Sequence, residues 1–223
     1  MNNIQKPIES HLNPDAASRR LPLAVKLGYS AFMAVLVPVY WANYGPTNFL
    51  YFCDVALFLT LAAVWLESAL LASMAAVGIV LPQIVWVVDF AAGLAGVNLL
   101  GMTAYMFDAK RSLFLRGLSL FHGWLPFLLL FLVKRLGYDK RAFPTWWALA
   151  WALVLFCYVF MPGPMPNATT PVNINYVHGM SDDAAQTWMP PLAWLATLMV
   201  GLPALLYWPT HLALKKWFTS TAE

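Results

Sequence analysis

Long apolar stretches separated by short polar turns make up most of this sequence. Six of these stretches have about the 20 residues that an α-helix needs to cross the ~30 Å hydrocarbon layer of a membrane. The predicted spans are Leu21–Trp41, Asn48–Leu66, Ala69–Phe90, Leu113–Val133, Phe143–Met161 and Trp188–Trp208. The pattern therefore predicts an all-α integral membrane protein built as a bundle of six transmembrane helices.

A seventh apolar stretch, Ala91–Phe107, is rich in glycine and follows the third span without a polar turn. The distribution of basic residues decides its place, because cytoplasmic loops are enriched in lysine and arginine. With six spans and a cytoplasmic N-terminus, ten of the thirteen basic residues lie inside, whereas a seventh span leaves seven inside and six outside. Six spans with both termini in the cytoplasm is the preferred topology, and seven is the alternative. Ala91–Phe107 then becomes an interfacial or re-entrant segment on the outer side, which protein or water must cover.

This topology divides the chain into three parts. Residues 1–20 are a cytoplasmic N-terminal segment, residues 21–208 are the transmembrane helical domain, and residues 209–223 are a cytoplasmic C-terminal tail. The first span follows twenty mostly polar residues and lacks a convincing small-residue cleavage site, so it is predicted to be a retained helix. The outer loop Pro162–Thr187 has no basic residue, and its four prolines predict a non-helical segment.

The composition agrees with a membrane protein. Hydrophobic residues make up 61% of the chain and charged residues only 10%, against about 25% charged residues in an ordinary soluble domain. No phosphate-binding loop, dinucleotide-binding glycine pattern or nucleic-acid-binding surface is present. We therefore expect membrane lipids as partners, no nucleic acid and no cofactor, and we expect the chain in a cell membrane, as in a bacterial inner membrane. The sequence leaves the oligomeric state open.

Several polar side chains are predicted to share the outer third of the bilayer. Polar groups inside a membrane are costly and are candidates for function. A thiol becomes a nucleophile when a nearby histidine takes its proton, and a carboxylate can fix the tautomer of that histidine. The predicted catalytic residues are Cys53 and Asp54 in the second span, Asp89 in the third and His122 in the fourth.

Neighbouring residues on a helix point about 100° apart. We therefore expect Cys53 to face His122 as nucleophile to base. Asp54 is expected to turn toward a neighbouring helix, and Asp89 is expected to orient His122. One histidine with two aspartates is a thin set of ligands, so no metal site is predicted.

Each of these residues also has a structural interpretation. Cys53 can be a small buried hydrophobe, His122 can bond a backbone carbonyl between helices, and the aspartates can pair with His122 or Arg116. Cys157 has no acid or base beside it and is predicted to be buried and inert, although a disulfide with Cys53 is conceivable. Glu67 lies in a tight turn and is predicted to be solvated, while Gln83 is predicted to bond between helices.

The order of four motifs adds a family resemblance. The stretches FLYFCDVALFLTLAAVWLES, AAVGIVLPQIVWVVDF, SLFHGWLPFLLLF and NINYVHG follow one another along the chain. In this order they resemble the YwaF-type bacterial integral membrane proteins. A eukaryotic transmembrane acyltransferase that moves fatty acyl chains between phospholipids is related to that family. The matching positions are Cys53-Asp54, Gln83 with Asp89, His122, and Asn175-Tyr176.

The resemblance implies a thiol nucleophile paired with an imidazole base. Two departures accompany it. The acidic residue of the family follows Thr-Pro, while Val87-Val88 precedes Asp89 here. The androgen-induced membrane hydrolases, more distant relatives, use a threonine near the second-helix motif, where this chain has Tyr51 and Phe52.

The leading hypothesis is a membrane-embedded, lipid-active enzyme, a thiol-dependent acyltransferase or lipid hydrolase. Its predicted substrate-binding residues are Gln83, Asn175, Tyr176 and His178. The alternative is a non-enzymatic membrane protein, such as a small transporter, sensor or partner subunit, whose aspartates and histidine are structural or bind an ion. A transporter needs polar groups that continue to the inner face, and this sequence has almost none there.

Overall fold

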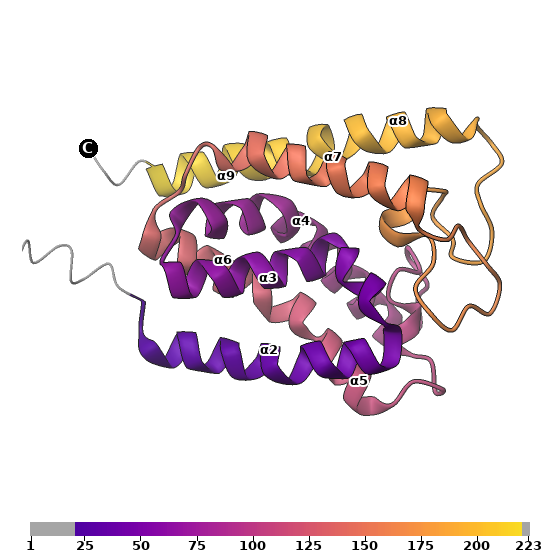
Figure 1. The fold of residues 1–223 in the computed structure, drawn as a ribbon, viewed down its shortest axis with the longest axis horizontal. Helices are drawn as coiled ribbons and strands as arrows, with labels where there is room; N and C mark the ends of the chain where they lie inside the picture. The colour runs from indigo at the N-terminus through magenta and orange to yellow at the C-terminus, as the bar shows by residue number, and fades with distance from the viewer. Residues whose placement is uncertain (1–20, 220–223) are drawn as a thin grey trace, which may run out of the picture.

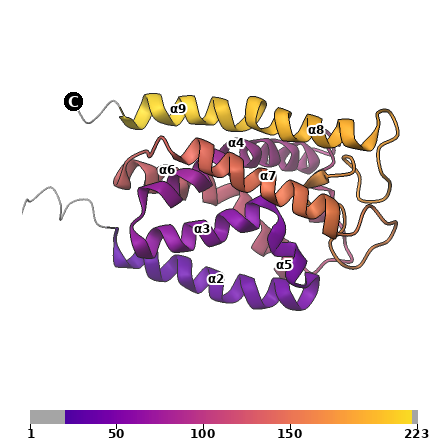
Figure 2. The same ribbon diagram turned by 45° about the horizontal axis from the view of Figure 1, so that its top comes forward.

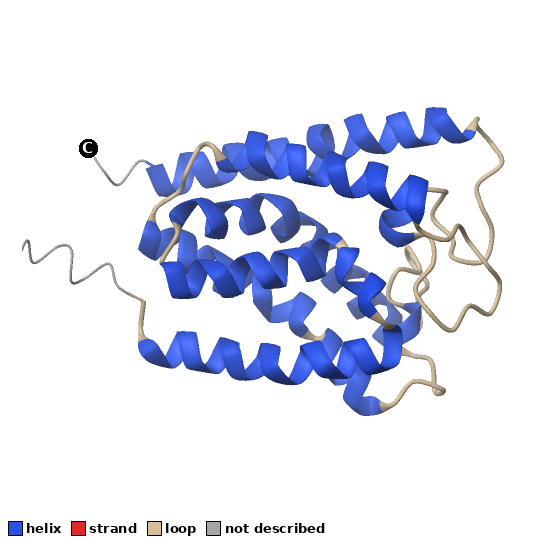
Figure 3. Cartoon of the chain, viewed as in Figure 1, coloured by secondary structure: helices blue, strands red, loops and turns tan. Residues whose placement is uncertain are grey.

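A computed structural model describes residues 21–219 of the chain as an all-helical bundle with no β-strand in that range (Figures 1 and 3). Residues 1–20 and 220–223 lie outside the described part. The elements in order are α2 (Leu23–Tyr44), η1 (Pro46–Leu50), α3 (Phe52–Leu66), α4 (Ala69–Leu94), η2 (Ala104–Met106), α5 (Leu113–Ser119), α6 (Phe121–Leu136), α7 (Ala142–Phe160), η3 (Ile174–Tyr176), α8 (Pro191–Leu202), the π-helical turn η4 (Pro203–Tyr207) and α9 (Trp208–Thr219).

The helices run roughly along one axis and give the bundle two distinct ends (Figures 1 and 2). The start of α2, the end of α9 and the short connections α3–α4 and α6–α7 meet at one end, which we call the terminal end. The two long connections, residues 95–112 and 161–190, lie at the opposite end, which we call the loop end. The loop end therefore gathers the segments that carry most of the predicted site residues.

Within residues 21–219, five helical segments are long and apolar enough to cross a membrane, which agrees with the prediction of an all-α multi-pass membrane protein. They are Leu23–Tyr44, Ala69–Leu94, Leu113–Leu136, Ala142–Phe160 and Pro191–Phe218. The predicted span Asn48–Leu66 differs, because its first residues belong to η1 and α3 has only 15 residues. At 1.5 Å per residue α3 is about 22 Å long, shorter than the ~30 Å hydrocarbon layer. Tyr51, in an extended conformation, separates the two helices.

Two other predicted spans also have different bounds. The span Leu113–Val133 is divided at Leu120 into α5 and α6. The last span starts at Pro191, and after the π-helical turn at Pro203 it continues as α9 to residue 219. Most of the predicted tail 209–223 is therefore helical in the described part of the chain.

Helix α4 lies at the centre of the bundle. In its most apolar stretch 61% of the residues are buried, against 22% in α2 and in α7. It packs against α3, α6 and α7, and small residues allow the close approach. At Gly78 an added Cβ would overlap the indole of Trp146 in α7 and lie 2.6 Å from its Cδ2. The absence of a side chain at this position thus sets how closely α4 and α7 pack.

The segment Ala91–Phe107 does not form a seventh helix. Its first four residues complete α4, and the rest is a loop with η2 near its end. Gly96, with φ of +78°, ends the helix, and the Val97 N–H donates to the Ala92 carbonyl at 2.9 Å. This six-residue closure with glycine in the left-handed region is a common helix C-cap.

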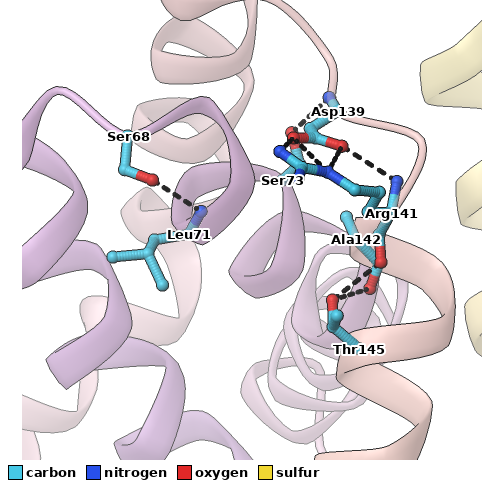
Figure 4. Close-up of polar contacts among 7 residues, drawn as sticks. All are labelled: Ser68, Leu71, Ser73, Asp139, Arg141, Ala142 and Thr145. Carbon is cyan, nitrogen blue, oxygen red and sulfur yellow. Dashed lines mark hydrogen bonds and ion pairs between the residues drawn. The ribbon is translucent and has the colours of Figure 1, made fainter.

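At the terminal end a polar network joins α4 to the connection between α6 and α7 (Figure 4). The Asp139 backbone N–H donates to Ser73 Oγ at 3.0 Å, and Arg141 Nη2 lies 2.7 Å from Asp139 Oδ2. The Arg141 guanidinium lowers the pKa of the Asp139 carboxyl. At the same end Lys26 Nζ lies 2.6 Å from Glu67 Oε1, so the prediction that Glu67 is only solvated is wrong.

Candidate functional site at the loop end

The start of α3 is fixed by a residue far away in the sequence. Asn175 Oδ1 accepts a hydrogen bond from the Phe52 N–H at 3.1 Å, and Asn175 Nδ2 donates to the Leu50 carbonyl at 2.9 Å. Asn175 adopts a left-handed conformation with φ of +60°, which asparagine tolerates better than most residues. One amide side chain thus joins η3 to the junction of η1 and α3, and it positions the helix that begins with Phe52 and Cys53.

The neighbouring Asn173 shapes the loop itself. Its Nδ2 donates to the carbonyls of Gly179 and Ser181, both at 2.9 Å, and its Oδ1 accepts from the His178 N–H at 2.8 Å. The His178 ring stacks on Tyr158 of α7 with 5.0 Å between ring centroids. No hydrogen bond among residues 21–219 joins the His178 side chain to the thiol region, so this predicted substrate-binding residue packs against α7 instead.

Cys53 and Asp54 differ in burial although they are adjacent. Cys53 is half-buried, while Asp54 is only 3% exposed. Asp54 Oδ2 accepts from Asn48 Nδ2 at 3.2 Å and from the Cys53 thiol at 3.9 Å. Asp54 Oδ1 is buried and has no hydrogen-bond partner in the described part of the chain. The carboxylate is therefore held by η1 on one oxygen and left unsatisfied on the other.

His122 lies in an aromatic sandwich at the start of α6. Its ring stacks on Trp86 and on Phe121, with centroids 4.8 Å and 4.0 Å away. Its Nδ1 lies 2.8 Å from the Ser119 carbonyl oxygen. A carbonyl only accepts, so Nδ1 carries a proton and Nε2 of the neutral ring keeps its lone pair. The predicted bond to a backbone carbonyl exists, but its acceptor is the last residue of the adjoining α5, three residues earlier, rather than a residue of a separate span.

Asp89 is only 2% exposed. Both oxygens of its carboxylate accept hydrogen bonds from the loop that follows α4. Oδ1 accepts from the N–H groups of Leu100 at 2.6 Å and Gly101 at 3.2 Å, and Oδ2 accepts from Thr103 N–H at 2.8 Å and Thr103 Oγ1 at 2.7 Å. Phe107 of the same loop lies directly on Gly93, where a Cβ would be 2.8 Å from Cζ of the ring. The contacts of Asp89 fold the loop 95–112 back onto α4.

Two tyrosines connect these segments. Tyr105 of η2 accepts a hydrogen bond from Trp86 Nε1 at 3.2 Å. Burial raises the pKa of the Tyr105 phenol, and Cys53 and Tyr176 add smaller contributions in the same direction. Burial likewise raises the pKa of Tyr176 to about 12, with contributions from Asp182, Cys53 and Asp89. The hydrogen bond from Trp86 connects Tyr105 of η2 to α4.

We call Cys53, Asp54, Tyr105, His122 and Tyr176 the loop-end cluster. Four of its members were predicted from the sequence. Tyr105 was not, because the stretch around it is mostly apolar. No hydrogen bond between residues 21 and 219 joins Cys53 to His122, and none joins Asp89 to His122, so the predicted nucleophile–base–acid relay is not connected by such bonds. Trp86 stacks on the histidine and donates a hydrogen bond to Tyr105, so contacts run from His122 through Trp86 to η2.

Two further residues of the sequence predictions are Gln83 and Cys157. Gln83 is 2% exposed and neither of its amide atoms has a hydrogen-bond partner in the described chain, so the predicted bond between helices is absent there. Cys157 is fully buried, as predicted, and both cysteines are free. Residues 21–219 contain no group of three or more histidine, cysteine or acidic side chains that could hold a metal ion.

Comparisons with protein-family models, with curated proteins and with solved structures gave no match to this chain. The resemblance to the YwaF-type proteins therefore rests on its motifs alone. The Asn175 side chain of one motif bonds the backbone of Leu50 and Phe52, which directly precede Cys53-Asp54 of another.

Proposed function

We propose that this chain is a membrane-embedded enzyme that transfers or hydrolyses the acyl chain of a lipid ester, with Cys53 as the nucleophile. The observation that supports this most is the clamp of Asn175 on the start of α3. It brings two motifs that lie more than 100 residues apart onto one end of the bundle. Cys53 remains half-buried there, and its thiol donates to the Asp54 carboxylate.

The reaction needs a proton acceptor and a donor. The thiol proton passes to His122 Nε2, the thiolate sulfur attacks the ester carbonyl carbon, and the ester C–O bond breaks as the leaving alkoxide takes the proton back. An acceptor alcohol or water then releases the acyl chain from sulfur and restores the thiol. The tautomer of His122, with its proton on Nδ1, fits this role. In this mechanism His122 and Cys53 come into contact when a lipid is bound, because catalytic hydrogen bonds often tighten only in the substrate complex.

The test compares two cysteines in the same protein. Cys53→Ala and His122→Ala should each abolish acyl transfer and ester hydrolysis by the purified chain in lipid vesicles, and Cys157→Ala should not, because Cys157 is buried in the core. An acyl chain with an electrophilic carbonyl should label Cys53 in the wild type and not in His122→Ala. Full activity of Cys53→Ala against a wild type that is active would reject the mechanism.

A second candidate is an ion-binding membrane protein without catalysis, and the state of Asp54 favours it. A buried carboxylate oxygen without a hydrogen bond in a membrane carries a large free-energy cost, and Asp54 Oδ1 is such an atom. A bound cation or water would satisfy it. Binding of Na⁺ or K⁺ that stabilises the wild type against heat and leaves Asp54→Asn unchanged would support this candidate over the enzyme.

We further propose six membrane crossings with both termini in the cytoplasm, α3 being the short sixth crossing together with η1. Of the described basic residues, seven lie at the terminal end and three at the loop end; the three are Lys110, Arg111 and Arg116. This asymmetry supports a cytoplasmic terminal end. Single cysteines introduced at Gly137 and Met180 should react with an impermeant thiol reagent from opposite sides of the membrane. Labelling from the same side contradicts the topology.

A further inference from the structure

The junction between α5 and α6 leaves one backbone carbonyl free for His122. In a continuous α-helix the Ser119 carbonyl would accept the Gly123 N–H, four residues further on. At this junction the Gly123 N–H donates instead to the carbonyl of Leu120, at 2.9 Å. His122 Nδ1 takes the place of the missing donor, 2.8 Å from the Ser119 oxygen. The helix break therefore supplies the acceptor that holds the imidazole proton on Nδ1.

Ser119 is itself held from another helix. It is 5% exposed, and its Oγ lies 2.9 Å from the hydroxyl oxygen of Tyr40 in α2. Tyr40 is also buried, so this pair of hydroxyls is shielded from water and lipid. The side chain of Ser119 is thus anchored to α2 while its carbonyl binds the imidazole.

The plane of the imidazole is set by a run of stacked aromatic rings. Each ring contacts the next with 4.0–5.6 Å between centroids and an angle of 16–28° between planes. From the loop 95–112 to α6 the members are Phe107, Phe90, Trp86, His122 and Phe121. Trp86 is buried, and its Nε1 donates to the Tyr105 hydroxyl at 3.2 Å. The indole that stacks on His122 is therefore fixed by both α4 and η2.

No acidic side chain takes part in this arrangement. Among residues 21–219 no carboxylate lies within 4 Å of a His122 nitrogen, and both oxygens of Asp89 are bonded to its own loop. A backbone carbonyl can fix the tautomer of a histidine as a carboxylate does. The groups that hold His122 are therefore aromatic rings, a hydroxyl pair and a main-chain oxygen.

We propose that Trp86 and Tyr40 are positioning residues for His122. Trp86 fixes the plane of the imidazole, and Tyr40 fixes its tautomer through Ser119. This rests on the proposed function, in which Nε2 of His122 accepts the thiol proton. With the ring held in both ways, the lone pair of Nε2 keeps one direction and needs no reorientation before proton transfer.

The experiment observes the imidazole directly by ¹⁵N NMR of the full-length chain labelled with ¹⁵N-histidine. The chain is placed in vesicles of an ether-linked phosphatidylcholine, which has no ester to cleave, at neutral pH. The chain has four histidines, so the spectrum of His122→Ala identifies the signals of His122. The wild type should show one set of ring signals, with the proton on Nδ1.

Two substitutions of Trp86 separate positioning from general stability. Trp86→Leu removes the stacked ring, and a second set of His122 signals, from a reoriented or Nε2-protonated ring, should become about tenfold more populated. Trp86→Phe keeps a ring against the imidazole and should retain the single wild-type set. A single wild-type set in folded Trp86→Leu would overturn the role of Trp86.

The hydroxyl pair provides a second test, which also decides the proposal if Trp86→Leu does not fold. Tyr40→Phe removes the bond to Ser119 and should give the second set of His122 signals. Tyr29→Phe is the matched control, because Tyr29 is a buried residue of the same helix whose hydroxyl donates to a backbone carbonyl of α3 at 3.0 Å. It should leave the His122 signals unchanged. Unchanged signals in Tyr40→Phe overturn the role of Tyr40, and equal changes in Tyr29→Phe assign the effect to a loosened fold and overturn both roles.

Activity measurements distinguish this proposal from the proposed function. In an active chain Trp86→Leu should lower kcat about 100-fold, the loss expected when a catalytic group is misplaced by about 1 Å. KM should stay within about twofold, and Trp86→Phe should restore most of kcat. A loss confined to KM in Trp86→Leu contradicts the positioning role. A wild type that neither transfers nor hydrolyses acyl esters defeats the proposed function, while the NMR spectra still decide whether Trp86 and Tyr40 orient His122.

Discussion

The contact between Gly78 and Trp146 gives the sharpest test of the packing. In Gly78→Ala the new methyl group would overlap the indole ring of Trp146, which is fully buried. Overpacking of this kind costs about 1–3 kcal/mol, and three ring atoms in close range favour the upper end. Alanine also improves helix propensity by about 1 kcal/mol. The net loss of unfolding free energy should be about 2 kcal/mol.

A loss of this size lowers the midpoint of thermal unfolding by about 4–8 °C for a chain of this length. The assay heats detergent-solubilised protein and measures the fraction that remains monodisperse on size exclusion. Gly28→Ala in α2 is the matched control, because a Cβ there meets nothing within 4 Å, and it should be neutral or stabilising. Adding Trp146→Phe to Gly78→Ala should recover part of the loss, as coupled neighbours do. A Gly78→Ala protein as stable as Gly28→Ala would refute the packing of α4 against α7.

Two further predictions concern polar contacts. The Arg141 guanidinium lowers the pKa of Asp139, so this pair stabilises the fold above the ordinary aspartate pKa of about 3.9 and stops doing so as the pH falls through the lower, folded value. Asp139→Asn should therefore melt below the wild type at pH 7, and the difference should vanish in acid. Asn175→Ala removes two bonds to the start of α3 and should cost about 1–3 kcal/mol, seen as earlier loss of monodisperse protein on heating; an unchanged midpoint would contradict the clamp.

Much of the helix layout follows from hydrophobicity alone. The predicted span Phe143–Met161 matches α7, Ala142–Phe160, within one residue at each end, because charged residues precede it and a proline-rich loop follows it. The start of α3 was predicted wrongly for a physical reason. The break at Tyr51 is stabilised by Asn175, more than 100 residues away, and no local pattern of apolar residues contains that contact.

The candidate site was only partly predictable for the same reason. Intramembrane depth identified Cys53, Asp54 and His122 as residues that need an explanation. The role of Asp89 was not predicted, because most of its partners are backbone N–H groups 11 to 14 residues further along the chain. Every residue type except proline can supply such a donor. Tyr105 was not predicted as a site residue because most residues around it in the loop are apolar.

The two membrane aspartates can now be separated by their hydrogen bonds. Asp89 has every acceptor occupied by its own loop, which is the arrangement of a structural residue. Asp54 has one buried oxygen without a partner, a cost that stability alone does not explain and that a bound substrate, ion or water would offset.

This contrast predicts opposite phenotypes. In Asp89→Asn the amide nitrogen cannot accept, so the protein should unfold earlier and trypsin should cut the loop 95–112 faster. Any loss of lipid activity or ligand binding in this variant should follow the loss of the folded loop. Asp54→Asn keeps an acceptor for Asn48 and should retain thermal stability, yet lose that activity or binding. Two results would contradict this distinction. One is digestion of the loop at the same rate in both variants, and the other is loss of function in Asp89→Asn with the loop intact. Either would show that hydrogen bonds do not distinguish structural from functional carboxylates.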